Sequence, residues 1–156
     1  MGLPKQSECL KLFGNPSAAG FAKKNLVSIV PPYQLRMGDI PMKRILINKV
    51  AAPSLTRVLA NVWAACGRDP KKIADIHADQ FSGSWAVRNA RGLRMISMHA
   101  YGLAVDFDAP HNQLGAHDHF FKRGNPLVDA FLAEGWVWGG PWSRPDAMHF
   151  QYAVVD

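Results

Sequence analysis

The sequence predicts an α+β fold in which helices flank a small antiparallel sheet. The chain has 156 residues, 48% of them apolar and 19% charged, which suits one sizeable core and is short for two domains. Two stretches show the apolar spacing of helices, and the remaining apolar runs are short and do not alternate regularly with helices. This mixture favours α+β over a parallel α/β sheet. We therefore expect residues 1–156 to form a single domain.

In the N-terminal half, we expect an irregular lead-in over residues 1–25, which are rich in Gly, Pro, Asn and Ser. Residues 26–30 and 43–50 have the composition of short strands, and a connection containing Pro and Gly joins them. The pattern predicts a hairpin.

The clearest helix covers residues 54–66. Its apolar residues have the spacing that lines one helical face, with Ser54 as the expected N-cap and Gly67 as the end. Cys66 falls on the buried face, so a structural role is expected for it rather than a nucleophilic one.

The C-terminal half contains a second predicted helix over residues 126–134, with Asn125 as its cap and Gly135 at its end. Strands are predicted at residues 103–108, 136–138 and 148–153.

The net charge of +6 comes from residues 1–80, which hold twelve Lys and Arg against five acids, whereas residues 81–156 hold six against seven. The basic residues are scattered, which favours solubility over recognition of an anionic polymer. No nucleic-acid-binding signature is present, so we expect no specific nucleic acid partner. The chain has no run of about eighteen apolar residues and no signal peptide at its start, so we expect no membrane association and synthesis in the cytoplasm. Two cysteines, Cys9 and Cys66, are too few for a disulfide framework or a thiolate cluster.

The most informative run extends from Ser97 to Asp106 and contains His99; near the C-terminus, His149 follows three residues after Asp146. Two histidines and one carboxylate meet the ligand requirement of a catalytic zinc site, which leaves a further position for water. In the strand over residues 103–108, Asp106 and Asp108 share a face, so their spacing alone allows either to be the carboxylate ligand.

Asp146 lies before the last predicted strand, where a loop would bring it close to the metal without ligating it. Such a carboxylate suits a general base: it takes a proton from a metal-activated water and later gives it to the leaving amine. The sequence lacks Gly-x-Ser-x-Gly and has no well-placed Cys, so a covalent nucleophile has little support.

The segment from residue 83 to residue 151 resembles the VanY-like zinc D-Ala-D-Ala carboxypeptidases and L-alanyl-D-glutamate endopeptidases of bacteria and phages. The resemblance rests on Ser-x-His-x-x-Gly-x-Ala-x-Asp at 97–106, Pro110 and Asn112, the Gly- and Trp-rich run at 135–142, and Asp-Ala-Met-His-Phe at 146–150. It implies a fold shared with Hedgehog signalling domains and with DD-peptidases.

Residue by residue, this resemblance implies one Zn²⁺ ion held by His99, Asp106 and His149, with Asp146 as the catalytic base. It therefore selects Asp106 over Asp108. It also places Arg88 where the family has an Arg that holds a substrate carboxylate, although Arg91 and Arg94 are close by. A bidentate guanidinium suits that ligand.

Other residues near these motifs have two interpretations each. Ser97 would orient the His99 loop by a hydrogen bond or simply cap a turn, and Tyr101 would line the substrate groove or pack in the core. Trp136, Trp138 and Trp142 are expected in the core rather than as a wall over the site. His77 is expected to be an ordinary structural residue, and His111, His117 and His119 to belong to a polar loop.

These observations favour a monomeric peptidoglycan peptidase that cuts the stem peptide either between L-Ala and D-Glu or before a terminal D-Ala. We expect a phage or prophage lysis enzyme that leaves the cytoplasm through a holin, or a phage-particle enzyme. The strongest alternative is a non-catalytic zinc-binding module that recognises cell wall or a protein partner. Asp146 and Arg88 favour the enzyme, because a binding module needs neither.

Overall fold

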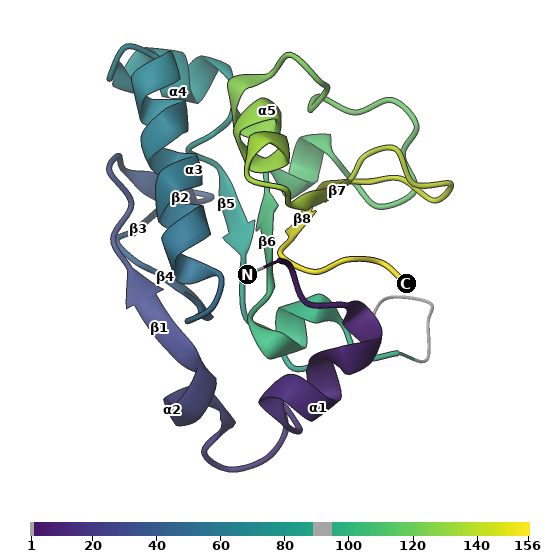
Figure 1. Cartoon of the computed structure of the whole chain (residues 1–156). Helices are drawn as coiled ribbons and strands as arrows, with labels where there is room; N and C mark the ends of the chain where they lie inside the picture. Colours follow the sequence, from purple (N-terminus) through teal and green to yellow (C-terminus); the bar gives the residue numbers. More distant parts are fainter. Residues whose placement is uncertain (1, 89–94) are drawn as a thin grey trace.

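The computed structural model describes residues 2–88 and 95–156. Its centre is a four-stranded antiparallel sheet in the order β5-β6-β8-β7. From one edge to the other, its strands are β5 (Phe81–Gly83), β6 (Ala104–Phe107), β8 (Asp146–Gln151) and β7 (Val137–Gly139). Helices α3 (Ala52–Ala65) and α5 (Pro126–Ala133) contact each other, and α5 packs on β7 (Figure 1). The fold is α+β, with small antiparallel sheets and flanking helices, as predicted.

The predicted N-terminal hairpin is present as β1 (Leu26–Ile29) and β4 (Ile45–Asn48), which pair antiparallel. The connection between them forms a second hairpin that the sequence did not predict, made of β2 (Leu35–Met37) and β3 (Ile40–Met42). Each of its strands is three residues long and β3 contains a Pro, so neither has the length or composition that identifies a strand.

The prediction of an irregular lead-in over residues 1–25 is wrong. This segment contains the 3₁₀ turn η1 (Gln6–Glu8) and the short helices α1 (Cys9–Phe13) and α2 (Phe21–Asn25). The side-chain amide of the buried Asn25 donates to the carbonyls of Phe13 and Phe21, which connects the two helices. Tertiary packing therefore overrides the turn-rich composition.

Helix α3 buries the apolar face that its sequence spacing predicts. Leu55, Val58, Leu59 and Val62 are fully buried on this face, and Cys66 is buried at the end of the helix. Ser54 is not its N-cap, because the helix begins earlier and Ala51 occupies that position. The Ser54 hydroxyl instead donates to Glu134 Oε1 and accepts from the Trp136 indole N–H, at 2.9 and 2.8 Å. A residue that resembled a cap therefore links α3 to the chain after α5.

Helix α5 agrees with its prediction, since the Asn125 side chain accepts a hydrogen bond from the backbone N–H of Leu127 and Gly135 follows with a φ of +83°. The sequence did not predict α4 (Pro70–Asp75) or strand β5. Helix α4 is capped by Asp69, but its six residues are too few to show a helical period.

The three C-terminal strands lie within one or two residues of their predicted positions. Leu103, just before β6, and Val105 and Phe107 within it are fully buried, whereas Asp106 is partly exposed and lines the cavity described below. Strand β8 begins two residues earlier than predicted, so Asp146 is part of the strand and does not lie in a loop before it.

The core includes residues from Cys9 to Ala153. Phe131 and Phe150 stack in it with ring centroids 4.2 Å apart, and Trp136 and Trp138 are buried as predicted. The assignment of residues 1–156 to one domain stays a prediction. Over the described part of the chain, no helix combines the length and apolar character needed to cross a membrane.

The segment near the N-terminus lies beside the segment that follows β8 (Figure 1). The backbone N–H of Gln6 donates to the carbonyl of Val154, and the N–H of Val154 donates to the carbonyl of Pro4, at 2.9 and 2.8 Å. This pairing holds Gln6 close to the end of β8.

Gly102 joins the N-terminal hairpin to the turn η2 (Met98–Tyr101), which precedes β6. Its φ is +71°, and a Cβ at this position would meet the side chain of Leu26 and the backbone nitrogen of Asn48. That nitrogen donates to the Gly102 carbonyl at 2.8 Å. Glycine is therefore required here both for its backbone conformation and for the close approach of β4.

We predict that Gly102→Ala destabilises the fold by about 2–4 kcal/mol, because left-handed backbone strain adds to a steric clash. Gly67→Ala is the matched control, since Gly67 has a φ of +64° and nothing within 4 Å of its added Cβ. It should lose only about 1–2 kcal/mol. Urea unfolding of both variants measures the difference, and equal losses would contradict the close packing at Gly102.

Candidate metal and peptide site

A cavity of about 350 Å³ opens at the edge where the ends of β6 and β8 meet the chain termini. Most of the predicted site residues line it. Its walls come from the N-terminal segment, η2 and the residues before it, β6, β8, the loop between β6 and α5, the loop before β8 and the C-terminal segment: Gln6, Arg88, Met95, Ile96, Ser97, Met98, His99, Asp106, Leu114, Trp142, Arg144, Asp146, Met148, His149, Gln151 and Val155.

Three side chains converge at one side of this cavity. His99 Nε2 lies 3.1 Å from Asp106 Oδ2 and 3.2 Å from His149 Nδ1, and His149 Nδ1 lies 3.3 Å from Asp106 Oδ1. Ligand atoms around a tetrahedral ion with bonds of about 2.0–2.1 Å are separated by about 3.3 Å, so this triangle has the dimensions of a zinc site. His99 and His149 are 3% and 7% exposed, so both imidazoles are held within the protein and only one side of the triangle faces the cavity.

In each imidazole, the outward nitrogen, which is the ring nitrogen that points away from Asp106, lies within hydrogen-bond distance of an oxygen acceptor. His99 Nδ1 lies 2.6 Å from the Ser84 carbonyl, and His149 Nε2 lies 2.8 Å from Gln151 Oε1. Because these oxygens can only accept, each outward nitrogen carries a proton, and the other ring nitrogen, His99 Nε2 or His149 Nδ1, is the one that faces Asp106. The second partner thus fixes the tautomer that metal coordination requires.

Gln151 is itself held in place. Its amide nitrogen donates to Gln6 Oε1 at 2.7 Å and to the Ala153 carbonyl at 3.0 Å, which leaves its oxygen facing His149. The N-terminal segment is therefore connected to the candidate ligands through two amides. Neither Gln6 nor Gln151 was identified from the sequence motifs, because their contact joins residues 145 positions apart.

The main chain around His99 is fixed by the turn η2. The Ser97 hydroxyl accepts a hydrogen bond from the backbone N–H of His99 at 3.2 Å. Ser97 is therefore the N-cap of the turn and also holds the backbone of His99 in position. Asp106 and His149 are direct cross-strand partners on β6 and β8. Directly opposed residues in an antiparallel pair have Cβ atoms about 5 Å apart, so the pairing itself brings the carboxylate to the imidazole.

Asp108 does not join this group. It follows β6 with a φ of +46°, which breaks the strand alternation, and its carboxylate lies against His77 and His111. Of the two carboxylates that spacing left open, the structure brings Asp106 to the site.

Asp146 lines the same cavity, with its side chain 20% exposed and its Oδ2 atom 3.9 Å from His149 Nδ1. Residues three apart point to opposite faces of a regular strand, yet Asp146 and His149 both reach the cavity. The ladder between β7 and β8 is irregular here, because Trp138 pairs with Phe150 whereas the next residue, Gly139, pairs with Asp146. This irregularity redirects Asp146, in the way that bulges re-aim side chains beside active sites.

Asp106 and His149 each shift the pKa of the other in the direction that favours its charged form. Burial opposes ionisation of Asp106, but hydrogen bonds and charge from His149 and His99 outweigh it and hold its pKa well below the ordinary range. Burial also disfavours a charged His149, yet its hydrogen bond to Asp106 and the charges of Asp106 and Asp146 raise its pKa. The metal-free site therefore holds an ionised carboxylate and a histidine that binds a proton readily.

Among the described residues, the rest of the cavity wall includes two arginines and a tryptophan beside several apolar side chains. Arg88 and Arg144 line it, and the Arg88 carbonyl accepts from the Ser97 N–H at 3.0 Å. Arg91 and Arg94, the other arginines near the first motif, lie outside the described residues. Trp142 stands 5.6 Å from the His149 ring, so this one of the three predicted core tryptophans belongs to the cavity wall instead. Arg144 was not identified from sequence.

Tyr101 is not brought to the cavity. Its side chain is 3% exposed and packs against Phe13 and Phe21, with ring centroids 6.3 and 6.4 Å away. The packing interpretation therefore describes it, and a groove-lining role does not. His119 also lies away from the cavity lining, with its Nδ1 atom donating to the Phe121 carbonyl.

The family comparison agrees with this geometry. Residues 90–152 match a protein family described as D-alanyl-D-alanine carboxypeptidase. The matched segment contains His99, Asp106, Asp146 and His149, which confirms the resemblance to the VanY-like family and supports a peptidase. Searches of curated proteins and of solved structures found no match.

The Gln151 contact predicts a measurable effect on metal affinity. Gln151→Met keeps the volume but removes the acceptor for His149 Nε2, and loss of such a partner weakens metal binding about 10- to 100-fold. Gln6→Met, which leaves the Gln151 oxygen in place, should have a smaller effect. Competition with a chelating dye measures both zinc affinities. Equal affinities in Gln151→Met and the unchanged protein would show that this contact does not support the site.

The raised pKa of His149 predicts how zinc binding depends on pH. Below that pKa the metal-free ring is protonated, so an ion must displace the proton, whereas above it the ring is neutral and ready to ligate. Asp106 stays ionised throughout because its pKa is lowered. Zinc affinity should therefore fall about tenfold per pH unit as the pH drops below the His149 pKa. Chelator competition from about pH 5.5 to about pH 8.5 tests this, and a flat profile would contradict it.

Proposed function

We propose that this protein is a zinc-dependent peptidase that hydrolyses a bond in the stem peptide of peptidoglycan. The observation that carries the proposal is the direction of the two imidazoles. Each gives its outward N–H to an oxygen and directs its other ring nitrogen toward Asp106, beside a second carboxylate in a cavity. The match of residues 90–152 to a D-alanyl-D-alanine carboxypeptidase family supports the reaction class.

In this proposal His99, Asp106 and His149 hold the zinc ion. Two neutral nitrogens and one carboxylate oxygen are ligands that zinc takes in catalytic sites, where a further position stays open. When bound, zinc would polarise the scissile carbonyl and make water a stronger nucleophile at neutral pH.

Asp146 is the proposed general base. It lines the cavity next to the ligand triangle, and its 20% exposure leaves it accessible to water and to a bound peptide. It takes a proton from the attacking water while the water oxygen bonds to the carbonyl carbon. It then donates that proton to the amine nitrogen as the peptide bond breaks. No covalent bond to the enzyme forms.

Arg88 is proposed to bind a carboxylate of the substrate, with Arg144 adding positive charge on the same cavity wall. A stem peptide carries such groups at its D-Glu residue and at its terminal D-Ala. A planar guanidinium binds a carboxylate through two parallel hydrogen bonds, which would set the position of the peptide relative to Asp146. Ser97 acts indirectly, by holding the backbone of His99.

Two bonds are candidates, the bond between L-Ala and D-Glu and the bond before a terminal D-Ala. Incubation of the zinc-loaded protein with defined stem peptides, followed by mass spectrometry, separates them. A product with a new D-Glu N-terminus identifies an endopeptidase, and free D-Ala identifies a carboxypeptidase. A folded, zinc-bound protein that cleaves neither bond would favour the alternative of a non-catalytic zinc-binding module.

The position of Asp146 favours the enzyme over that module, because a binding module has no use for a carboxylate beside the ligands. We predict that Asp146→Asn, which keeps the shape but cannot accept the proton, lowers kcat about 10²- to 10⁴-fold. Zinc stoichiometry should be unchanged, since Asp146 is not a proposed ligand. Asp129→Asn is the control. It replaces an exposed carboxylate on α5 and should keep full activity. An active Asp146→Asn variant would remove Asp146 from this role.

The biological setting we propose is lysis of the bacterial wall by a phage or prophage, with a monomeric enzyme made in the cytoplasm and released through a holin. Particle-borne delivery is the second possibility. Expression inside bacteria with and without a pore-forming protein tests the first, because lysis should require both. Detection of the protein in purified virions would support the second.

A further inference from the structure

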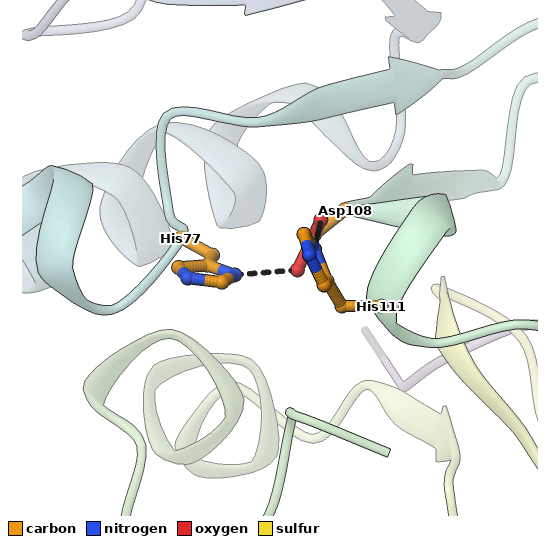
Figure 2. Close-up of side chains that lie close together, drawn as sticks. All are labelled: His77, Asp108 and His111. Atoms are coloured by element: carbon orange, nitrogen blue, oxygen red, sulfur yellow. Dashed lines mark hydrogen bonds and ion pairs between the residues drawn. The ribbon is translucent and has the colours of Figure 1, made fainter.

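We infer that His77, Asp108 and His111 form a second binding site for a divalent transition-metal ion, separate from the proposed catalytic zinc site. Figure 2 shows the two imidazole rings directed at the Asp108 carboxylate. His77 follows α4, Asp108 follows β6, and His111 ends the 3₁₀ turn η3 (Ala109–His111). The inference does not depend on the proposed peptidase function.

The geometry of this cluster brings two nitrogens and a carboxylate together. His77 Nδ1 lies 2.6 Å from Asp108 Oδ2, and His111 Nδ1 lies 2.7 Å from Asp108 Oδ1. The ligand atoms of the three residues all fall within 4.8 Å of one another, as they do in the triangle of His99, Asp106 and His149. Among the described residues, these are the two groups with such an arrangement.

Asp108 is held firmly as the centre of the cluster. It is 2% exposed, and the Asn112 amide donates both to its backbone carbonyl and to its Oδ2 atom, at 2.9 and 3.2 Å. Both His77 and Asp108 have positive φ, at +61° and +46°, an uncommon conformation for residues with a side chain. A buried carboxylate fixed in this way loses little freedom when it binds an ion.

The two histidines differ in exposure and packing. His77 stacks on Phe120 with ring centroids 3.7 Å apart, whereas the His111 side chain is 62% exposed. The present spacing of 2.6–2.7 Å is that of hydrogen bonds, and ligands of one tetrahedral ion lie about 3.3 Å apart. An ion would replace the Nδ1 protons, and the exposed His111 ring has room to move outward by the fraction of an ångström required.

The ligand types determine which ions fit. Two imidazole nitrogens and one carboxylate oxygen suit Zn²⁺, Ni²⁺, Co²⁺ or Cu²⁺, whereas Ca²⁺ and Mg²⁺ prefer sets made of oxygen. Because His111 faces solvent, water would complete the coordination. An ion here would connect the turn after α4 to the end of β6, the strand that carries Asp106.

The test is zinc stoichiometry of the full chain, measured by elemental analysis after equilibrium dialysis against micromolar zinc. The unchanged protein should bind two ions per chain and His111→Asn one. The control is His117→Asn, an exposed histidine on the following loop, which should still bind two. His99→Asn should also bind one, and the double variant His99→Asn, His111→Asn none.

Circular dichroism establishes that each variant is folded, and the exposure of His111 makes its replacement tolerable. A stoichiometry of one in the unchanged protein that persists in His111→Asn and is lost in His99→Asn would overturn the inference. So would two ions in His111→Asn, or an equal loss in His117→Asn. Because the readout is bound metal, a protein without peptidase activity that binds two ions would still support the second site.

Discussion

The pairing of β6 with β8 is the constraint on which the candidate site depends. It places Asp106 directly opposite His149, and every other component is arranged around that pair. A slip of one residue would turn the side chains of one strand to the other face and separate the carboxylate from the imidazole. The register is held by the core side of the same strands, where Val105 and Phe150 are fully buried partners. Hydrophobic burial thus fixes the position of polar groups that would otherwise be unfavourable to assemble.

The residues around Asp106 and His149 determine how the two histidines and Asp146 are oriented in the site. The Ser84 carbonyl and Gln151 accept hydrogen bonds from the outward N–H groups of His99 and His149, so the other ring nitrogens face Asp106. Gly102 allows the turn that carries His99 to approach β4, and the irregular β7-β8 ladder brings Asp146 to the same cavity as His149. The site therefore draws on both ends of the chain, through Gln6 and Gln151, although its motifs lie in the C-terminal half.

Sequence reasoning worked where a residue carries its role in a local pattern. The helix ended by Gly67, the Asn125 cap and the strand carrying Asp106 all have such patterns, and the structure has them near the predicted positions. It failed where long-range contacts decide. Ser54 resembled a cap but bonds Glu134, Tyr101 resembled a groove residue but packs on Phe13, and the lead-in folds into helices around Asn25. His77 gave no signal, because its partner Asp108 lies thirty-one residues away.

The most direct test of the central claim is the position of the metal in crystals grown with zinc, located by anomalous scattering at the zinc edge. The account predicts a peak coordinated by His99 Nε2, His149 Nδ1 and an Asp106 oxygen, with Ser84 and Gln151 still bonded to the outward nitrogens. A zinc-saturated crystal with no peak between these three side chains would contradict it, whatever ions were found elsewhere.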